Sequence, residues 1–349
     1  MPFLNGMDAN YVPLMRDLSL GWKSERGKLI ENFYRYMAKK GINCCRVRLW
    51  VGDGGPSRFN YAIPIMNMAR EARMGIYLAI FLSEGWADLY KQPAPHPWNL
   101  MSIEKRVKAV NSYVRDVVKR VFLLNFKPTL YQVGNEIDYG ICGVFASDKD
   151  RRKNLNWLKK HVWCHEAEIL KSAFKGIRDT DSEAYLAIHL GKWWDHQLFV
   201  SFLQAMEDFN VNFDVLSVSF YPSMLGAGFD VLDEMKERAD VLSKKLIIAE
   251  YAYPSNLLRG QFWFMSKQVP TYPMTPERQA AWIRDFISYC QRLNISGIFY
   301  WSPEMYLSVK MAKKLKAPAE MPLSFGWGPM ALFDESGNAK PSINSFKLS

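Results

Sequence analysis

Short apolar segments rich in Val, Ile, Leu and aromatic residues alternate along the chain with longer segments whose apolar residues return every three or four positions. The first pattern predicts buried strands, and the second predicts amphipathic helices. Strands are expected at residues 3–10, 44–51, 75–82, 129–136, 184–190, 213–222, 246–254 and 297–303. Helices are expected at residues 25–40, 103–124, 154–177, 232–242 and 276–293.

Strands that alternate with helices predict a parallel sheet joined by crossover helices, and eight such strands predict a closed (β/α)8 TIM barrel. The Gly-rich phosphate loops typical of a doubly wound open sheet, GxGxxG and GxxxxGK[ST], are missing from the sequence. No internal repeat or Pro/Ser-rich linker marks a boundary, so residues 1–349 are expected to form one catalytic domain. Long connections at 257–275 and 310–328 follow strands seven and eight and are expected to shape a cleft.

The composition, with 49% hydrophobic and 23% charged residues, is that of a globular protein with a large core. No apolar run approaches the roughly 18 residues that cross a bilayer, so no membrane partner is expected. Residues 1–12 lack the basic and apolar regions of a signal peptide, and a mature secreted form is slightly favoured as the localisation. Five cysteines without a CxxC pair do not suggest a disulfide framework.

The net charge of +10 raises the question of nucleic acid, but the basic residues are dispersed and interleaved with acids. We therefore expect no nucleic-acid partner. We also expect the protein to be a monomer. A solvated basic surface is the first interpretation of this charge. A second hypothesis is that the positive field helps the protein approach an acidic polysaccharide matrix. His161, Cys164 and His165 lie on a helical stretch without a second pair of ligands nearby, so neither a metal site nor a cofactor is expected.

Polar and aromatic residues gather where the expected strands end, at the face on which barrel enzymes place their active sites. Two of these residues are glutamates, Glu136 at the end of strand four and Glu250 at the end of strand seven. Carboxylates on opposite walls of a barrel mouth can face each other across a sugar, and a retaining glycosidase needs them about 5–5.5 Å apart. The sequence therefore predicts Glu136 as acid/base and Glu250 as nucleophile.

The neighbours of the two glutamates suggest supporting roles. Asn135 is placed to hold a sugar hydroxyl, and Arg48 is expected to lie under Glu250 and keep it ionised. Tyr221 is expected to donate a hydrogen bond that orients Glu250. Glu136 must hold a proton near neutral pH, which burial or the charge of Glu250 would favour by raising its pKa.

Aromatic rings at strand ends suggest platforms for the apolar face of a sugar. Trp86 and Trp301 directly follow strands three and eight and are the first candidates, with Asp88 beside Trp86. Trp98, Trp193 and Trp194 lie in loops at the same rim and are weaker candidates. His189, which ends strand five, is either a substrate ligand or a satisfied core histidine. Asp8, near the end of strand one, either takes part in the site or braces the barrel.

Segments across nearly the whole chain resemble glycoside hydrolase family 53: GMDANYV (6–12), CRVRLWV (45–51), SEGWADLYKQ (83–92), YQVGNEI (131–137), FDVLSVSFYP (213–222), AEYAYP (249–254), GIFYWSP (297–303) and GWGPMALFDESGNAKPS (326–342). That family contains arabinogalactan endo-β-1,4-galactanases with catalytic glutamates on strands four and seven. The resemblance implies that Asn135 and Glu136 form the Asn-Glu acid/base motif and that Glu250 is the nucleophile. It also implies a galactan or arabinogalactan substrate.

One segment departs from the family pattern. Members typically read HYSDxWADP where this chain has FLSEGWADL at 81–89, so Phe81 replaces a histidine and Glu84 an aspartate at the expected cleft. This difference leaves open a retaining barrel hydrolase that acts on another β-linked glycan, such as a glucan, a mannan or a differently linked galactan. A non-catalytic glycan-binding barrel is the remaining alternative, and the presence of both glutamates argues against it.

Overall fold

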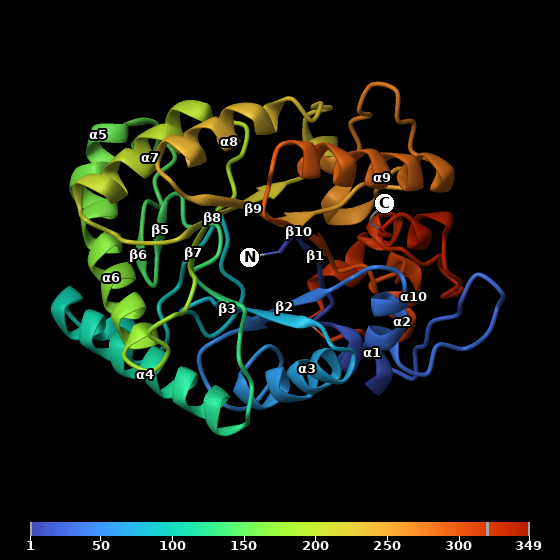
Figure 1. Cartoon of the computed structure of the whole chain (residues 1–349), viewed down its shortest axis with the longest axis horizontal. Coiled ribbons are helices and arrows are strands. Elements are labelled where there is room, and N and C mark those ends of the chain that lie inside the picture. Colours follow the sequence, from blue (N-terminus) through green and yellow to red (C-terminus); the bar gives the residue numbers. More distant parts are fainter. Residues whose placement is uncertain (1, 319–320, 348–349) are drawn as a thin grey trace.

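The computed structural model describes residues 2–318 and 321–347, and within them eight parallel strands close into a barrel (Figure 1). Around the barrel the order is β1-β10-β9-β8-β7-β4-β3-β2. The expected TIM barrel is confirmed, with strands at β1 (Leu4–Asp8), β2 (Cys44–Leu49), β3 (Gly75–Ile80), β4 (Leu130–Val133), β7 (Leu186–Leu190), β8 (Val215–Phe220), β9 (Lys245–Tyr251) and β10 (Gly297–Trp301). A small hairpin of β5 (Gly140–Ile141) and β6 (Val144–Phe145) follows β4.

Helices surround the barrel on its outside (Figure 1): α1 (Val12–Asp17), α2 (Phe33–Lys39), α3 (Phe59–Glu71), α4 (Ile103–Leu123), α5 (Leu155–Leu158), α6 (Cys164–Arg178), α7 (His196–Asp208), α8 (Val231–Val241), α9 (Pro276–Arg292) and α10 (Val309–Lys314). A π-helical turn, Lys159–Trp163, joins α5 to α6, so the expected helix at 154–177 is nearly continuous.

The expected helix at 25–40 is wrong over its first part. Asn32 caps α2 by accepting a hydrogen bond from the backbone N–H of Arg35, so the helix begins at Phe33. The preceding residues turn at Gly27, whose φ is +72°, and Lys23 pairs with Leu29 in an antiparallel bridge. Helices α3 and α7 were not predicted. Each buries one apolar face against the sheet, as Phe199, Phe202 and Met206 do in α7.

The side chains inside the barrel change character from its bottom to its top. Near the amino ends of the strands the interior is apolar and includes Leu4, Cys44, Tyr77, Leu130 and Phe299. Gly6 leaves room there for the ring of Phe299, since a Cβ at Gly6 would lie 2.2 Å from that ring. Further along β1, β2 and β4 the inward residues Asp8, Arg46 and Gln132 are polar. Successive inward positions of these strands therefore form a packed apolar floor and, above it, a polar layer.

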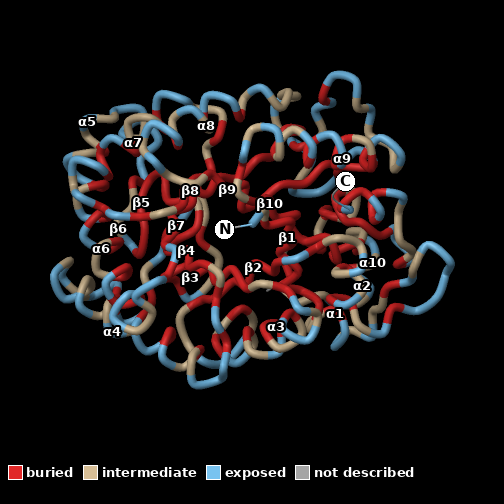
Figure 2. The backbone as a smooth tube through the Cα atoms, viewed as in Figure 1, coloured by how far each residue is buried: buried red, intermediate tan, exposed pale blue. Residues whose placement is uncertain are grey.

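The solvent exposure of the residues agrees with this arrangement of the barrel. In Figure 2 the central strands are red, as buried, and pale blue exposed backbone runs mainly along the outer helices and loops. The upper layer is also inaccessible to solvent, because Asp8, Arg46, Gln132 and His189 are each 0% exposed. Such buried polar groups must bond one another, so they form a fixed frame beneath the barrel mouth. Within the part of the chain that the structure describes, no helix is both long and apolar enough to cross a membrane.

Candidate active site

A β-bulge turns Glu250 toward the barrel interior. On β9, Ile248 and Glu250 pair with the consecutive residues Val218 and Ser219 of β8, so Ala249 is an extra residue. The same irregularity appears on the other side of β9, where the register against β10 shifts. Without the bulge, alternation would point Glu250 outward, because Ile247 and Ala249 already face the interior core.

Both carboxylate oxygens of Glu250 are held by neighbours at the barrel mouth. Nη1 of Arg46 donates to Oε1 at 2.8 Å, and the hydroxyl of Tyr221 donates to Oε2 at 2.8 Å. Burial raises the pKa of Glu250, and the charge of Arg46 is the strongest influence that lowers it. The hydrogen bond expected from Tyr221 to Glu250 is therefore present, and a contact between Tyr221 and substrate stays a prediction.

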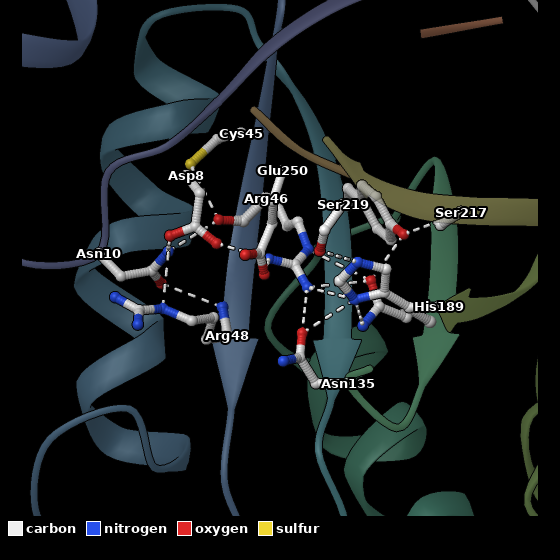
Figure 3. Close-up of polar contacts among 12 residues, drawn as sticks. Asp8, Asn10, Cys45, Arg46, Arg48, Asn135, His189, Ser217, Ser219 and Glu250 are labelled. Atoms are coloured by element: carbon white, nitrogen blue, oxygen red, sulfur yellow. Dashed lines mark hydrogen bonds and ion pairs between the residues drawn. The ribbon is translucent and has the colours of Figure 1, made fainter. Parts of the chain in front are cut away.

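Arg46, and not Arg48, is the cation beneath Glu250, so the sequence-based pairing was wrong. Figure 3 shows the Arg46 guanidinium among Asp8, Glu250 and Asn135. Nη1 also donates to Oδ2 of Asp8 at 2.8 Å, and Nη2 donates to Oδ1 of Asn135 at 2.8 Å. Both arginines point into the barrel, but Arg46 lies two residues lower on β2. One planar guanidinium therefore joins β1, β4 and β9.

Arg48 serves a different part of the mouth. Its Nε lies 3.3 Å from Oδ1 of Asp8, and its guanidinium lies over the rings of Tyr11 at 4.6 Å and Trp86 at 5.4 Å. Since Arg48 is only 1% exposed, it supports these rings from below. A direct contact between Arg48 and substrate stays a prediction.

Glu136 follows β4 in a tight turn of unusual backbone conformation. Gly134 has a φ of +78°, and Glu136 itself has a φ of +50°, a region that non-glycine residues adopt at a cost. The turn is closely packed, because a Cβ on Gly134 would lie 2.4 Å from Ile137, and one on Gly191 would lie 2.6 Å from the Glu136 carboxyl carbon. This packing holds the Glu136 carboxyl group at the mouth of the barrel.

The environment of Glu136 favours its protonated form. Burial raises the pKa of Glu136 well above its usual range, and the charge of Glu250 raises it further. Ser219 opposes this by donating to Oε1 of Glu136 at 2.7 Å. In the described residues no Lys or Arg forms an ion pair with Glu136, in contrast to Glu250. Two carboxyl groups in one site are therefore placed in different surroundings, the arrangement that separates an acid from a nucleophile.

His189 links Glu136 to the polar layer below. Its Nε2 lies 3.0 Å from Oγ of Ser219, and its Nδ1 lies 3.0 Å from Oδ1 of Asn135. Burial lowers the pKa of His189 well below its usual range, and the nearby Arg46 charge adds to this, so the imidazole is neutral. The sequence placed Ser219 among the polar residues at the end of strand six but gave it no role of its own.

Replacing Ser219 tests whether its hydrogen bond lowers the pKa of Glu136. The hydroxyl bonds Oε1 and favours the ionised form of Glu136, so Ser219→Ala should raise the pKa of Glu136 further. Because the acid acts in its protonated form, the alkaline limb of the kcat/KM profile should move to higher pH. A pH profile of both proteins checks this. An alkaline limb that stays in place or moves to lower pH contradicts it.

Replacing Tyr221 tests whether its hydrogen bond positions the Glu250 carboxylate for catalysis. Tyr221→Phe removes the 2.8 Å hydrogen bond to Glu250 while keeping the ring. A hydrogen bond to a charged group contributes about 1.5–3 kcal/mol, so kcat should fall by about 10- to 100-fold. KM should change little, and steady-state kinetics separates the two constants. Unchanged kcat would show that Tyr221 is only a packing residue.

Both glutamates line one cavity with an aromatic wall. The lining includes the predicted Trp86, Asp88, Tyr221 and Trp301, together with Leu89, Tyr90, Gly191, Trp193, Trp194, Met224, Phe262, Phe264, Met265 and Trp327. The connections expected over the mouth at 257–275 and 310–328 supply Phe262 and Trp327, whose rings pack at 5.4 Å. A second hollow shares Trp86, Trp301 and Phe262, so the groove continues past the aromatic wall.

The remaining predicted site residues fall into two groups. Asp88 lines the cavity and accepts a hydrogen bond from Nε1 of Trp86 at 2.8 Å, so it fixes the orientation of that ring. Asn135 and His189 are 0% exposed and bond the frame below, which leaves a contact with substrate as a prediction for both. Trp98 packs edge-to-face on Tyr113, away from the cavity lining.

The family model described as glycosyl hydrolase family 53 matches residues 4–346. The chain belongs to glycosyl hydrolase family 53. An arabinogalactan endo-beta-1,4-galactanase of Thermothelomyces thermophilus is 25% identical over 357 residues, covering 98% of each chain. A second one, of Cellvibrio japonicus, is 26% identical over 319 residues, which cover 86% of this chain and 80% of that one.

Solved structures agree with the fold of a family 53 barrel. A structure from a study of two fungal beta-1,4-galactanases has a TM-score of 0.82 at 22% identity, covering 99% of both chains. The family 53 catalytic domain of Ignisphaera aggregans has a TM-score of 0.81 at 24% identity, covering 99% of this chain and 95% of that one. The chain is thus a glycoside hydrolase by family, with both glutamates in one cavity.

The two departures from the family 53 pattern do not line that cavity. Phe81 is 0% exposed and packs behind Trp86, with ring centroids 5.7 Å apart. Glu84 is exposed, and its Oε1 accepts a hydrogen bond from the backbone N–H of His96 at 3.1 Å. The expectation that both residues lie at the substrate cleft was therefore wrong, because the strand end places Phe81 beneath the surface and turns Glu84 toward solvent.

Proposed function

We propose that this family 53 hydrolase is a retaining, endo-acting β-1,4-galactanase that hydrolyses galactan or arabinogalactan. One observation carries the proposal: Glu136 and Glu250 line the same cavity, and only Glu250 is paired with a cation. Family membership and the names of the relatives support the same substrate. The polysaccharide is the partner that this site requires.

The first half of the reaction forms a bond between enzyme and sugar. A carboxylate oxygen of Glu250 attacks the anomeric carbon while the bond to the glycosidic oxygen breaks. Glu136 gives its proton to that oxygen, and the leaving sugar chain departs as an alcohol. Arg46 and Tyr221 hold the attacking carboxylate in place, so little reorganisation accompanies the step.

The second half releases the bound sugar. The Glu136 carboxylate takes a proton from a water molecule, whose oxygen attacks the anomeric carbon as the bond to Glu250 breaks. Glu136 is protonated again and Glu250 is ionised, so both residues return to their starting states. Two inversions at one carbon give net retention.

The shape of the groove supports action within a chain. The hollow around the two glutamates and the neighbouring hollow share Trp86 and Trp301, so sugars can extend beyond the cleavage point. Indole rings stack on the apolar faces of sugars, and Trp194 lines the same hollow as the two glutamates.

The test is hydrolysis of linear β-1,4-galactan followed by proton NMR of the products. We expect short oligosaccharides, with the β-anomer appearing first and mutarotating later. The same protein should leave linear β-1,4-glucan and β-1,4-mannan intact. Cleavage of those glycans in preference to galactan refutes the substrate, and an α-anomer as first product refutes retention.

A further inference from the structure

A basic pocket beside the active site has no role in the steps above. It is a cavity of about 350 Å³ lined by the basic residues Lys149, Arg152, Lys153 and Lys192, and by one acid, Asp195. Segments 148–153 and 192–195, which form it, contain five basic and three acidic residues. The positive charge is therefore concentrated here and not only dispersed over the surface.

Arg152 is fixed in this pocket with part of its guanidinium open. Its Nε donates to the carbonyl of Ala146 at 2.7 Å, and its Nη1 donates to that of Leu89 at 3.2 Å. The rings of Tyr139 and Phe145 lie 4.7 and 4.8 Å from its central carbon. Within residues 2–318 and 321–347 no carboxylate pairs with Arg152, and Nη2 donates no hydrogen bond. A guanidinium held in this way is preorganised for a carboxylate.

Asp195, the acid that lines the pocket, already accepts hydrogen bonds from other groups of the protein. Oδ2 of Asp195 accepts from Nζ of Lys192 at 2.7 Å, and Oδ1 accepts from the backbone N–H of Leu198 in the first turn of α7. Lys153 bonds Asp150 at 2.8 Å, but these side chains are 79% and 87% exposed, where an ion pair contributes little. The pocket thus keeps a positive potential toward an incoming anion.

The pocket adjoins the wall of the acid/base. Leu89, whose carbonyl Arg152 binds, has its backbone N–H 3.4 Å from Oε2 of Glu136. Tyr90, which directly follows Leu89, lines the active-site cavity together with Glu136. Lys192 directly follows Gly191, which packs on the Glu136 carboxyl group. Because Glu136 protonates the leaving oxygen, sugars near this wall belong to the leaving part of the substrate.

We propose that the basic pocket binds the carboxylate of an acidic sugar, such as a uronic acid, on the leaving-group side of the cleavage point. The inference rests on the proposed glycanase function and adds an acidic residue to its substrate. Arg152 supplies the fixed donors, and Lys149 and Lys153 supply long-range attraction. The enzyme would then favour galactan chains attached to an acidic polysaccharide over free neutral chains.

The experiment compares two matched substrates. One is a β-1,4-galactooligosaccharide with galacturonic acid at its reducing end, and the other is the same molecule with that carboxyl group reduced to the alcohol. At low salt the native protein should show a kcat/KM about tenfold higher for the acidic form, the effect of one charge-assisted hydrogen bond near solvent. Arg152→Gln should remove the preference, measured as the ratio of kcat/KM for the acidic form to kcat/KM for the neutral form in the same variant. Lys149→Glu/Lys153→Glu, which keeps the guanidinium, should weaken the preference because the long-range attraction is lost.

A matched control separates the pocket from overall charge. Lys108→Glu/Lys119→Glu changes the net charge equally on the exposed face of α4 and should keep the preference. Equal kcat/KM values for the two substrates in the native protein would refute carboxylate binding by the pocket. A preference that falls as much in the control variant as in the pocket variant would refute it as well. Trigalacturonate binding, measured by calorimetry without hydrolysis, reports the pocket alone. Binding without galactan hydrolysis refutes the proposed function, whereas galactan hydrolysis without binding refutes only the pocket.

Discussion

Glu250→Ala is expected to lower kcat on β-1,4-galactan by about 10⁴-fold or more, because no other group can form the bond to the sugar. Glu136→Ala should lower it by about 10²- to 10⁴-fold, the usual contribution of a general acid. The two variants should differ on an aryl β-galactoside with a good leaving group. There the first half of the reaction needs no proton, so Glu136→Ala should keep a rapid first step.

Azide separates the two roles further. In Glu136→Ala an azide ion can enter near the lost carboxylate and attack the glycosyl intermediate, giving a β-galactosyl azide. In Glu250→Ala it can replace the nucleophile and give the α-product. Folded structure is checked by circular dichroism in both. The same azide product from both variants, or full activity in either, contradicts the assigned roles.

Arg46→Met is expected to have the largest effect on stability. Arg46 is completely buried and forms ion pairs with Asp8 and Glu250, each at 2.8 Å. Removing one partner of a buried ion pair leaves an uncompensated charge and costs about 3–5 kcal/mol. The free energy of unfolding, measured with denaturant, should fall by this amount.

The same substitution should change the pH profile. The charge of Arg46 lowers the pKa of Glu250 against the effect of burial, so its loss should raise that pKa. Since the nucleophile acts in its ionised form, the acid limb of kcat/KM should move to higher pH. Arg48→Met is the control, because Arg48 contacts Asp8 and Tyr11 and not Glu250. Equal shifts of the acid limb in both variants would contradict the assignment of Arg46.

The strands and the two glutamates could be predicted because they depend on local pattern. Apolar segments marked each strand, and the carboxyl ends of parallel strands must meet at one face, which brought Glu136 and Glu250 together. Helices α4, α6, α8 and α9 were also found from their apolar stripes, whereas α7 was missed although it has such a stripe. Helix α3 was missed: it carries Pro64 inside, which a pattern search treats as a break.

The choice between Arg46 and Arg48 could not be made from the sequence. Both residues fall on the inward side of β2, so alternation treats them alike. Which one reaches Glu250 depends on the bulge at Ala249 and on the heights of neighbouring strands around the barrel. Phe81 was expected at the cleft because it replaces a histidine of the family pattern, but its ring lies behind Trp86.

The basic pocket is a second feature that could not be predicted from the sequence. Its cations come from two segments, 148–153 and 192–195, each of which also carries acids. In the sequence these charges look dispersed. The fold brings them together because the loops after β4 and β7 end at the same rim, and because Asp195 turns toward Lys192 and the first turn of α7.

The central claim is that Glu250 forms the covalent bond to the sugar, and trapping that bond tests it most directly. A 2-fluoro galactoside with a good leaving group slows release of the intermediate, so the labelled protein can be digested and its peptides weighed. We predict one added fluorogalactosyl group, carried by Glu250 in the peptide that contains β9. A label on any other residue, or complete turnover to a product of inverted configuration, contradicts the account.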